Sequence, residues 1–281
     1  MPDSDFHLDL EDMRFALFQS TPFEQLLACD VNKESDAESL AMLIDEAARF
    51  NKEQVAPIDG PAEKVGAVFS AGKVTMPAGV DAVYKKICAG GWLSLTAPEA
   101  YGGMALPYIM QVLIGEMQVG ACNSLSIGFG LTEAAAHAIE VCGSDAMQKT
   151  YLEKLYSGEW QGTMCLTEPG AGSAVGDALT TAKPAETTAL NAAEKTLGDP
   201  WMIEGTKIFI SFGEHDLTDN HIHLVLARTP GAPKGAKGIS LFLVPKFRLS
   251  EDGAVGEFNN VDCAGIEHKM GIHASPTCVM K

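Results

Sequence analysis

Residues 167–173, Thr-Glu-Pro-Gly-Ala-Gly-Ser, combine a hydroxyl, a carboxylate and a run of small residues. They continue a stretch, 160–167, that we predict to be a strand. Glycine has no Cβ, so a ligand can approach the backbone closely, and hydroxyl and backbone N–H groups can bind the polar edge of a flat ring or a phosphate. This segment is therefore a candidate ligand-binding loop.

Three interpretations of this loop compete. A dinucleotide fingerprint, G-x-G-x-x-G, needs glycine where Val175 stands, and Lys183–Pro184 would interrupt the helix that the fingerprint requires. A plain turn also fits Glu-Pro-Gly. The third interpretation uses more of the chain and is given below. Glu168 could act as a base, but its place directly after a strand favours holding the loop through backbone hydrogen bonds.

The elements that position this loop change in kind along the chain. Helical spacing predicts helices over 35–50 (with a Ser35/Glu38 capping box, the run closing at Pro57), 78–89, 107–121, 131–142 and 144–157. Residues 61–76 are predicted as a loop with a short hairpin. Strands are predicted over 160–167, twice within 201–211, and over 221–228 and 239–245. Helices followed by strands indicate an α+β fold, with a helical domain at 1–158 and a β domain at 159–281.

Four motifs, in order, resemble those of the acyl-CoA dehydrogenase family. Residues 97–103 are similar to its P-x-x-[YF]-G-G turn, and 167–173 resemble its flavin-binding strand and loop. Residues 205–211 resemble its G-x-K-x-[WF]-I-[ST] strand, and 267–277 its K-[ML]-G-x-x-[AS]-S strand. The resemblance covers nearly the whole chain. The stretch 211–223 resembles the long-polypeptide branch that includes 3-(methylthio)propanoyl-CoA dehydrogenases.

The resemblance implies an FAD-dependent enzyme that desaturates an acyl-CoA between its α and β carbons. It implies a helical N-terminal domain, a β-barrel-like middle domain and a C-terminal four-helix bundle, with electrons passing to an electron-transfer flavoprotein and a homo-oligomeric assembly. The residues assigned to FAD by resemblance are Met164, Leu166, Thr167, Phe209 and Ser211. Ser173, with Gly172 beside it, is assigned to the acyl-CoA.

Two departures from the family pattern bear on function. Ala174 stands where the family usually has Asp, and Phe209 stands where Trp is commoner. The four-helix bundle, which carries the family's catalytic base, lies outside this sequence, so no base is assigned. We expect this polypeptide alone to turn over no substrate and to retain FAD weakly. An acyl-CoA oxidase and a non-catalytic flavin- or acyl-CoA-binding scaffold remain as alternatives.

Composition excludes several other classes. The net charge of −17 disfavours nucleic acid and anionic membrane surfaces as partners. Apolar runs are too short for a membrane span, the N-terminus lacks an apolar signal region, and seven cysteines without a C-x-x-C pair suit a reducing cytoplasm. His221 and His223 share a strand face but lack further ligands, so no metal site is predicted and both are expected to be surface or interface residues. For His215, in a polar loop, a solvated turn and a ligand role are equally compatible with the sequence.

Overall fold

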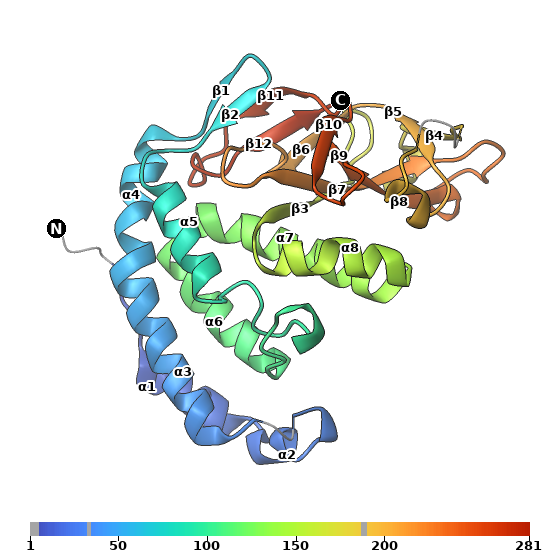
Figure 1. Ribbon diagram of the computed structural model, residues 1–281. Coiled ribbons are helices and arrows are strands. Elements are labelled where there is room, and N and C mark those ends of the chain that lie inside the picture. The colour runs from blue at the N-terminus through green and yellow to red at the C-terminus, as the bar shows by residue number, and fades with distance from the viewer. Residues whose placement is uncertain (1–5, 33–34, 187–189) are drawn as a thin grey trace.

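The computed structural model describes residues 6–32, 35–186 and 190–281. Helices occupy most of the first half and strands most of the second, with the two halves packed as layers (Figure 1). The helices are α1 Leu10–Phe15, α2 Phe23–Leu27, α3 Ala37–Phe50, α4 Ala56–Val65, α5 Val80–Ala89, α6 Tyr108–Ala121, α7 Asn123–Cys142 and α8 Asp145–Tyr156. The strands are β1 Val68–Ser70, β2 Lys73–Thr75, β3 Trp160–Cys165, β4 Thr181–Pro184, β5 Trp201–Glu204, β6 Lys207–Ser211, β7 Asn220–Arg228, β8 Ile239–Pro245, β9 Phe247–Leu249, β10 Val255–Phe258, β11 Cys263–Glu267 and β12 Thr277–Met280.

Helix α3 begins and ends differently from the sequence prediction. Its N-cap is Asp36, whose carboxylate accepts a hydrogen bond of 2.8 Å from the backbone N–H of Ser39, so the Ser35/Glu38 capping box was wrong. The helical run does not close at Pro57 but passes through a π-helical turn, Asn51–Val55, into α4. Pro57 lies in the first turn of α4, where the missing N–H needs no partner.

The helical core is built around one face of α6. Met110, Ile114 and Met117 are fully buried there, whereas Met104, which precedes the helix, is 39% exposed. Helix α6 begins directly after Pro107 and α8 is capped by Ser144, whose side chain accepts from the backbone of Met147. The predicted helices 107–121, 131–142 and 144–157 are therefore confirmed, with α7 starting earlier than expected.

The strands form several sheets rather than a closed barrel. One sheet has the order β3-β7-β4-β5, with β8 also paired to β7, and a second has the order β11-β12-β6. Strand β3 runs parallel to β7, and β6 pairs antiparallel with β12. Within the described residues the sheets do not close, so the β-barrel-like prediction holds only as far as a β-rich middle region.

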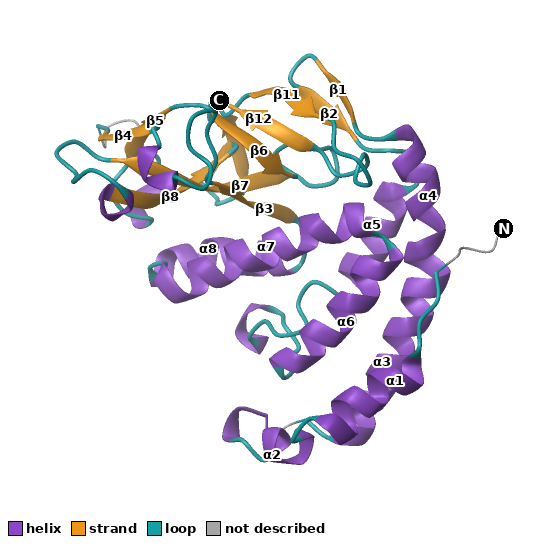
Figure 2. Cartoon of the chain, turned by 180° about the vertical axis from the view of Figure 1, so that it is seen from behind, coloured by secondary structure: helices purple, strands orange, loops and turns teal. Residues whose placement is uncertain are grey.

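Helix α7 lies directly beneath β3 and joins the two layers (Figures 1 and 2). The side chain of Gln161 donates to the carbonyl of Gly128 at 2.9 Å, and a Cβ at Gly162 would lie 2.6 Å from that of Ala135. The predicted hairpin β1–β2 is confirmed. Although it belongs to the first half of the chain, its Val74 packs into the core of the β layer.

Candidate functional site

The loop after β3 is held by a buried ion pair. Lys207 Nζ lies 2.8 Å from Glu168 Oε1 and also donates to the carbonyl of Leu166 at 3.1 Å, and both charged side chains are 5% exposed. The Glu168 carboxylate accepts two further hydrogen bonds, from the backbone N–H groups of Leu179 at 2.6 Å and Thr180 at 3.0 Å. The prediction that Glu168 holds the loop is confirmed, and its oxygens are committed to that role.

The protonation state of Glu168 follows from these contacts. Burial by itself would raise the pKa of the carboxyl, but the hydrogen bonds from Lys207 and from the two backbone N–H groups outweigh it and lower the pKa to about 2. The carboxyl is therefore ionised at neutral pH. A carboxylate with such a low pKa is a poor proton acceptor, because a general base works best with a pKa near the operating pH.

The two segments assigned to the flavin lie side by side. The backbone N–H of Ile208, on β6, donates to the carbonyl of Thr167 at 2.8 Å. The residues that follow β3 therefore lie next to the start of β6. Met164, Leu166, Thr167 and Ser211 are half-buried, and Phe209 is 46% exposed. Gly172 and Ser173 are exposed in the loop. The structure therefore groups the assigned residues on neighbouring backbone segments.

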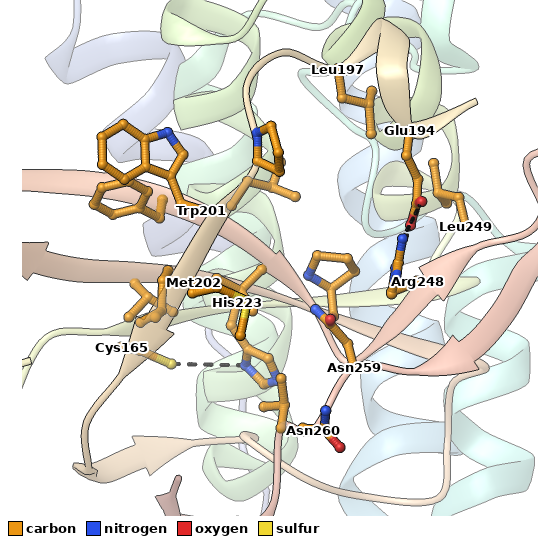
Figure 3. A pocket seen from close by; sticks show the side chains of 18 of the residues that line it. Cys165, Glu194, Leu197, Trp201, Met202, His223, Arg248, Leu249, Asn259 and Asn260 are labelled. Carbon is orange, nitrogen blue, oxygen red and sulfur yellow. Dashed lines mark hydrogen bonds and ion pairs between the residues drawn. The ribbon is translucent and has the colours of Figure 1, made fainter. Parts of the chain in front are cut away.

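A cavity of about 830 Å³ lies on a different face of the β layer. Cys165, His223 and Trp201 are among its lining residues (Figure 3), and Lys207 also lines it. Met164, the neighbour of Cys165 on β3, packs instead against the cluster formed with α7 and α8. For Met164 this follows from the alternation of strand side chains between the two faces. None of the residues assigned to FAD or acyl-CoA lines this cavity.

Cys165 and His223 form a neutral contact in this cavity. Cys165 Sγ lies 3.8 Å from His223 Nδ1, which also lies 2.7 Å from Thr163 Oγ1. Burial raises the pKa of the Cys165 thiol to about 12 and lowers the pKa of the His223 imidazole to about 3. Because the nucleophilic form of cysteine is the thiolate, this pair does not form an activated nucleophile at neutral pH.

The prediction that His221 and His223 are surface or interface residues was wrong, and His215 does not lie in a solvated turn. His215, His221 and His223 are 3%, 1% and 1% exposed, with ring centroids 4.4 Å apart for the first two and 6.1 Å for the last two. Burial keeps all three pKa values low, to about 3 for His215 and His223. In the part of the chain that the structure describes, no group of three ligating side chains could hold a metal.

The local sequence contained only an incomplete signal for this burial. Strand β7 runs His-Ile-His-Leu-Val-Leu, so apolar residues alternate with the two histidines and one face reads as polar. That alternation is typical of a strand with one solvated face. In the structure Val225, on the same face of β7 as the two histidines, packs against residues of β6, β11 and β12, and β7 is buried along nearly its whole length.

The chain has helices followed by strands, and comparison with known proteins assigns it to a family. The N-terminal domain of acyl-CoA dehydrogenase matches residues 37–159, and the middle domain of the same family matches 163–281. The chain belongs to the acyl-CoA dehydrogenase family. Among the described residues, no helix is long and apolar enough to cross a membrane.

Individual relatives cover the whole chain. It is 38% identical over 280 residues to the 3-methylmercaptopropionyl-CoA dehydrogenase of Ruegeria pomeroyi, covering 98% of this chain and 45% of that protein. It is 36% identical over 281 residues to a butyryl-CoA dehydrogenase of Syntrophomonas wolfei, covering 99% and 44%. The chain thus spans about half the length of the curated relatives that it matches.

Solved structures show the same arrangement. An acyl-CoA dehydrogenase from Bacillus anthracis complexed with FAD superposes with a TM-score of 0.65 at 25% identity, over 88% of this chain and 36% of that one. A structure described as the electron transferring flavoprotein of Acidaminococcus fermentans superposes with a TM-score of 0.67 at 25% identity, over 88% and 55%.

Proposed function

We propose that this chain forms the N-terminal and middle domains, 1–158 and 159–281, of an FAD-dependent dehydrogenase that desaturates an acyl-CoA between its α and β carbons. One observation supports this most directly: the residues that resemble the family's flavin strands lie on adjacent backbones, joined by the hydrogen bond from Ile208 N–H to the Thr167 carbonyl. Similarity to named acyl-CoA dehydrogenases along the whole chain supports it independently.

The residues present suit an isoalloxazine. Within the described residues, neither the Thr167 nor the Ser211 hydroxyl has a hydrogen-bond partner in the protein, so both can serve the polar edges of a ring. A Cβ at Gly170 would meet no atom within 4 Å, and one at Gly172 would meet only Thr167 Cγ2 at 4.0 Å. This open backbone leaves room for a ligand, as a flat cofactor beside the loop requires.

Each side chain has an assigned role. Met164 and Leu166 would supply apolar contact, Thr167 and Ser211 hydrogen bonds to the ring edges, and Phe209 an aromatic wall. Bound FAD would supply the hydride acceptor. The exposed Ser173 and Gly172 would lie along the acyl-CoA, where hydrogen bonds to the thioester carbonyl stabilise the enolate that develops when the α proton leaves. The Glu168–Lys207 pair keeps the loop in place for both ligands.

We further propose that the complete protein is a cytoplasmic homo-oligomer that passes electrons to an electron-transfer flavoprotein. The acidic surface, at a net charge of −17, suits a protein that works in aqueous solution. The support for the electron-transfer flavoprotein as a partner is membership of the acyl-CoA dehydrogenase family.

The test is an anaerobic titration of the purified full-length holoenzyme with butyryl-CoA and 3-methylmercaptopropionyl-CoA. Bleaching of the flavin absorbance, with slow reoxidation by oxygen, supports a dehydrogenase. Rapid reoxidation by oxygen would identify an oxidase instead. A flavin spectrum that neither thioester bleaches would favour the non-catalytic scaffold, and a protein that binds no FAD would refute the flavin assignment itself.

A further inference from the structure

The connection between β11 and β12 is held firmly against both layers. His273 Nδ1 lies 2.7 Å from one carboxylate oxygen of Glu63 near the end of α4, and the backbone N–H of His273 donates to the other oxygen of that carboxylate at 2.6 Å. Its carbonyl accepts from Ala67 at 2.8 Å. At the other end of the connection, the Pro276 carbonyl accepts from Phe212 at 2.8 Å. Lys269 lies between the end of β11 at Glu267, which pairs with Thr277, and the His273 anchor, so it is presented in a defined position.

Lys269 lies on this connection and covers the ring of Phe209. Its Nζ is 4.5 Å from the ring centroid, within the range of a cation–π contact. In the described ranges, no carboxylate lies within 4.0 Å of that ammonium. The charge is thus not neutralised by a neighbouring acid, although the chain as a whole is strongly acidic.

Phe209 itself has an unusual backbone. Its φ is +59°, in the left-handed region that bulky residues rarely adopt, and its ring is 46% exposed. Such a conformation persists only where the surroundings enforce it, and it concentrates at functional sites. The Lys269 contact is one such constraint, since it pins the ring from one side and leaves the remainder of the ring open.

We propose that Lys269 is a positioning residue for the flavin. The inference rests on the proposed function, in which Phe209 borders the isoalloxazine. Lys269 then holds the aromatic wall in place and sets an uncompensated positive charge one ring away from the cofactor. Hydride transfer adds a pair of electrons and negative charge to the site, and a nearby cation stabilises that charge. The residue therefore favours the reduced state.

Replacement of the charge tests this in the full-length holoenzyme. Lys269→Met keeps the aliphatic stem, Lys269→Arg keeps the charge, and Lys85→Met, on an α5 side chain that is 72% exposed, is the matched control. We expect Lys269→Met to lower the equilibrium constant for two-electron flavin reduction about tenfold, a shift of about 30 mV to more negative potential. FAD affinity should fall about threefold, and the visible flavin band should shift. Lys269→Arg should restore all three.

The possible outcomes distinguish failure of the Lys269 role from failure of the proposed function. If the wild type binds no FAD, the proposed function and this inference both fail. If the wild type binds FAD and Lys269→Met leaves the potential and the spectrum unchanged, only the role of Lys269 is refuted. An equal shift in Lys269→Met and Lys269→Arg would also refute it, because the charge would then not be responsible.

Discussion

The ammonium of Lys207 lies 2.8 Å from the carboxylate of Glu168, and both side chains are almost completely removed from solvent. Residues 39 positions apart in the sequence are thereby joined beneath the loop that follows β3. A buried ion pair is weak evidence of net stabilisation, but removal of one partner leaves an uncompensated buried charge. Replacement of one member of this pair should therefore lower the stability of the protein measurably.

Replacement of Lys207 by Met should destabilise the protein by about 3–5 kcal/mol, because Glu168 would remain buried without its cation. Urea unfolding followed by circular dichroism measures the change. Lys85→Met breaks the solvent-exposed pair with Asp81 and should change stability by less than about 1 kcal/mol. A Lys207→Met protein within 1 kcal/mol of the wild type would contradict the role of the pair.

The buried histidines should make the protein sensitive to mild acid. Their folded-state pKa values lie below the ordinary 6.5, so the unfolded state takes up protons first. Their contribution is intact above about pH 6.5 and is lost progressively toward about pH 3. Each histidine adds up to about 1.4 kcal/mol of lost stability per pH unit.

His221→Phe isolates this effect, because neither ring nitrogen of His221 has a hydrogen-bond partner among the residues that the structure describes. Stability measured from pH 7 to pH 5 should fall less steeply than in the wild type, by about one histidine's contribution. His7→Asn, at an exposed position, is the control. Identical slopes for His221→Phe and the wild type would show that His221 is not held neutral.

Glu133 should act in the opposite direction. Burial between α6 and α7 raises the pKa of its carboxyl to about 7, although hydrogen bonds of 2.9 and 3.0 Å from Gln111 partly offset this. A raised folded-state pKa means that stability is complete below the unfolded value of 4.5 and is lost as pH rises through about 7.

Glu133→Gln should therefore stabilise the protein at pH 8 by about 1–3 kcal/mol and have little effect at pH 5. Urea unfolding at the two pH values checks this, with Glu38→Gln in the exposed first turn of α3 as the control. A gain that is the same at both pH values would indicate a packing effect and not relief of a buried charge.

Gly128 marks the closest approach of α7 to the β layer. A Cβ there would lie 2.7 Å from the ring of Phe212, which is fully buried with a φ of +53°. Gly128→Ala should destabilise by about 1–3 kcal/mol through overpacking. Gly130→Ala, two positions on with nothing within 4 Å, should stabilise by about 0.5–1 kcal/mol through helix propensity. The thermal unfolding temperatures of the two variants should thus shift in opposite directions. Equal shifts would show that the ring of Phe212 can move aside to accommodate the added methyl group.

Flavin binding gives a prediction at the assigned residues. Thr167→Val and Ser211→Ala each remove one hydroxyl without a large change in volume, and each should weaken FAD binding by about fivefold to tenfold if it hydrogen-bonds the ring. Fluorescence titration of the full-length apoprotein measures this. Thr196→Val, in the short 3₁₀ turn Glu194–Thr196 away from the loop, is the control. If neither Thr167→Val nor Ser211→Ala changes the affinity for FAD, these hydroxyls do not bind the flavin.

Local sequence was enough to predict most elements, since periodicity and turn residues act over a few positions. It failed at helix continuity, where a π-helical turn carries α3 past the expected end near Pro57. It also failed at pairing. Strands β5 and β6 are separated only by Gly205 and Thr206, yet β5 pairs with β4 in one sheet and β6 with β12 in the other.

By itself, the sequence determined the family, the α+β order of elements and the loop 167–173 with Glu168 as its anchor, because each depends on residues close together in the chain. The tertiary structure decided that Lys207 is the partner of Glu168, that His215, His221 and His223 are buried, and that Lys269 covers Phe209. The physical reason is that residue pattern shows which faces of an element differ, whereas long-range packing decides what covers each face and which charges meet there.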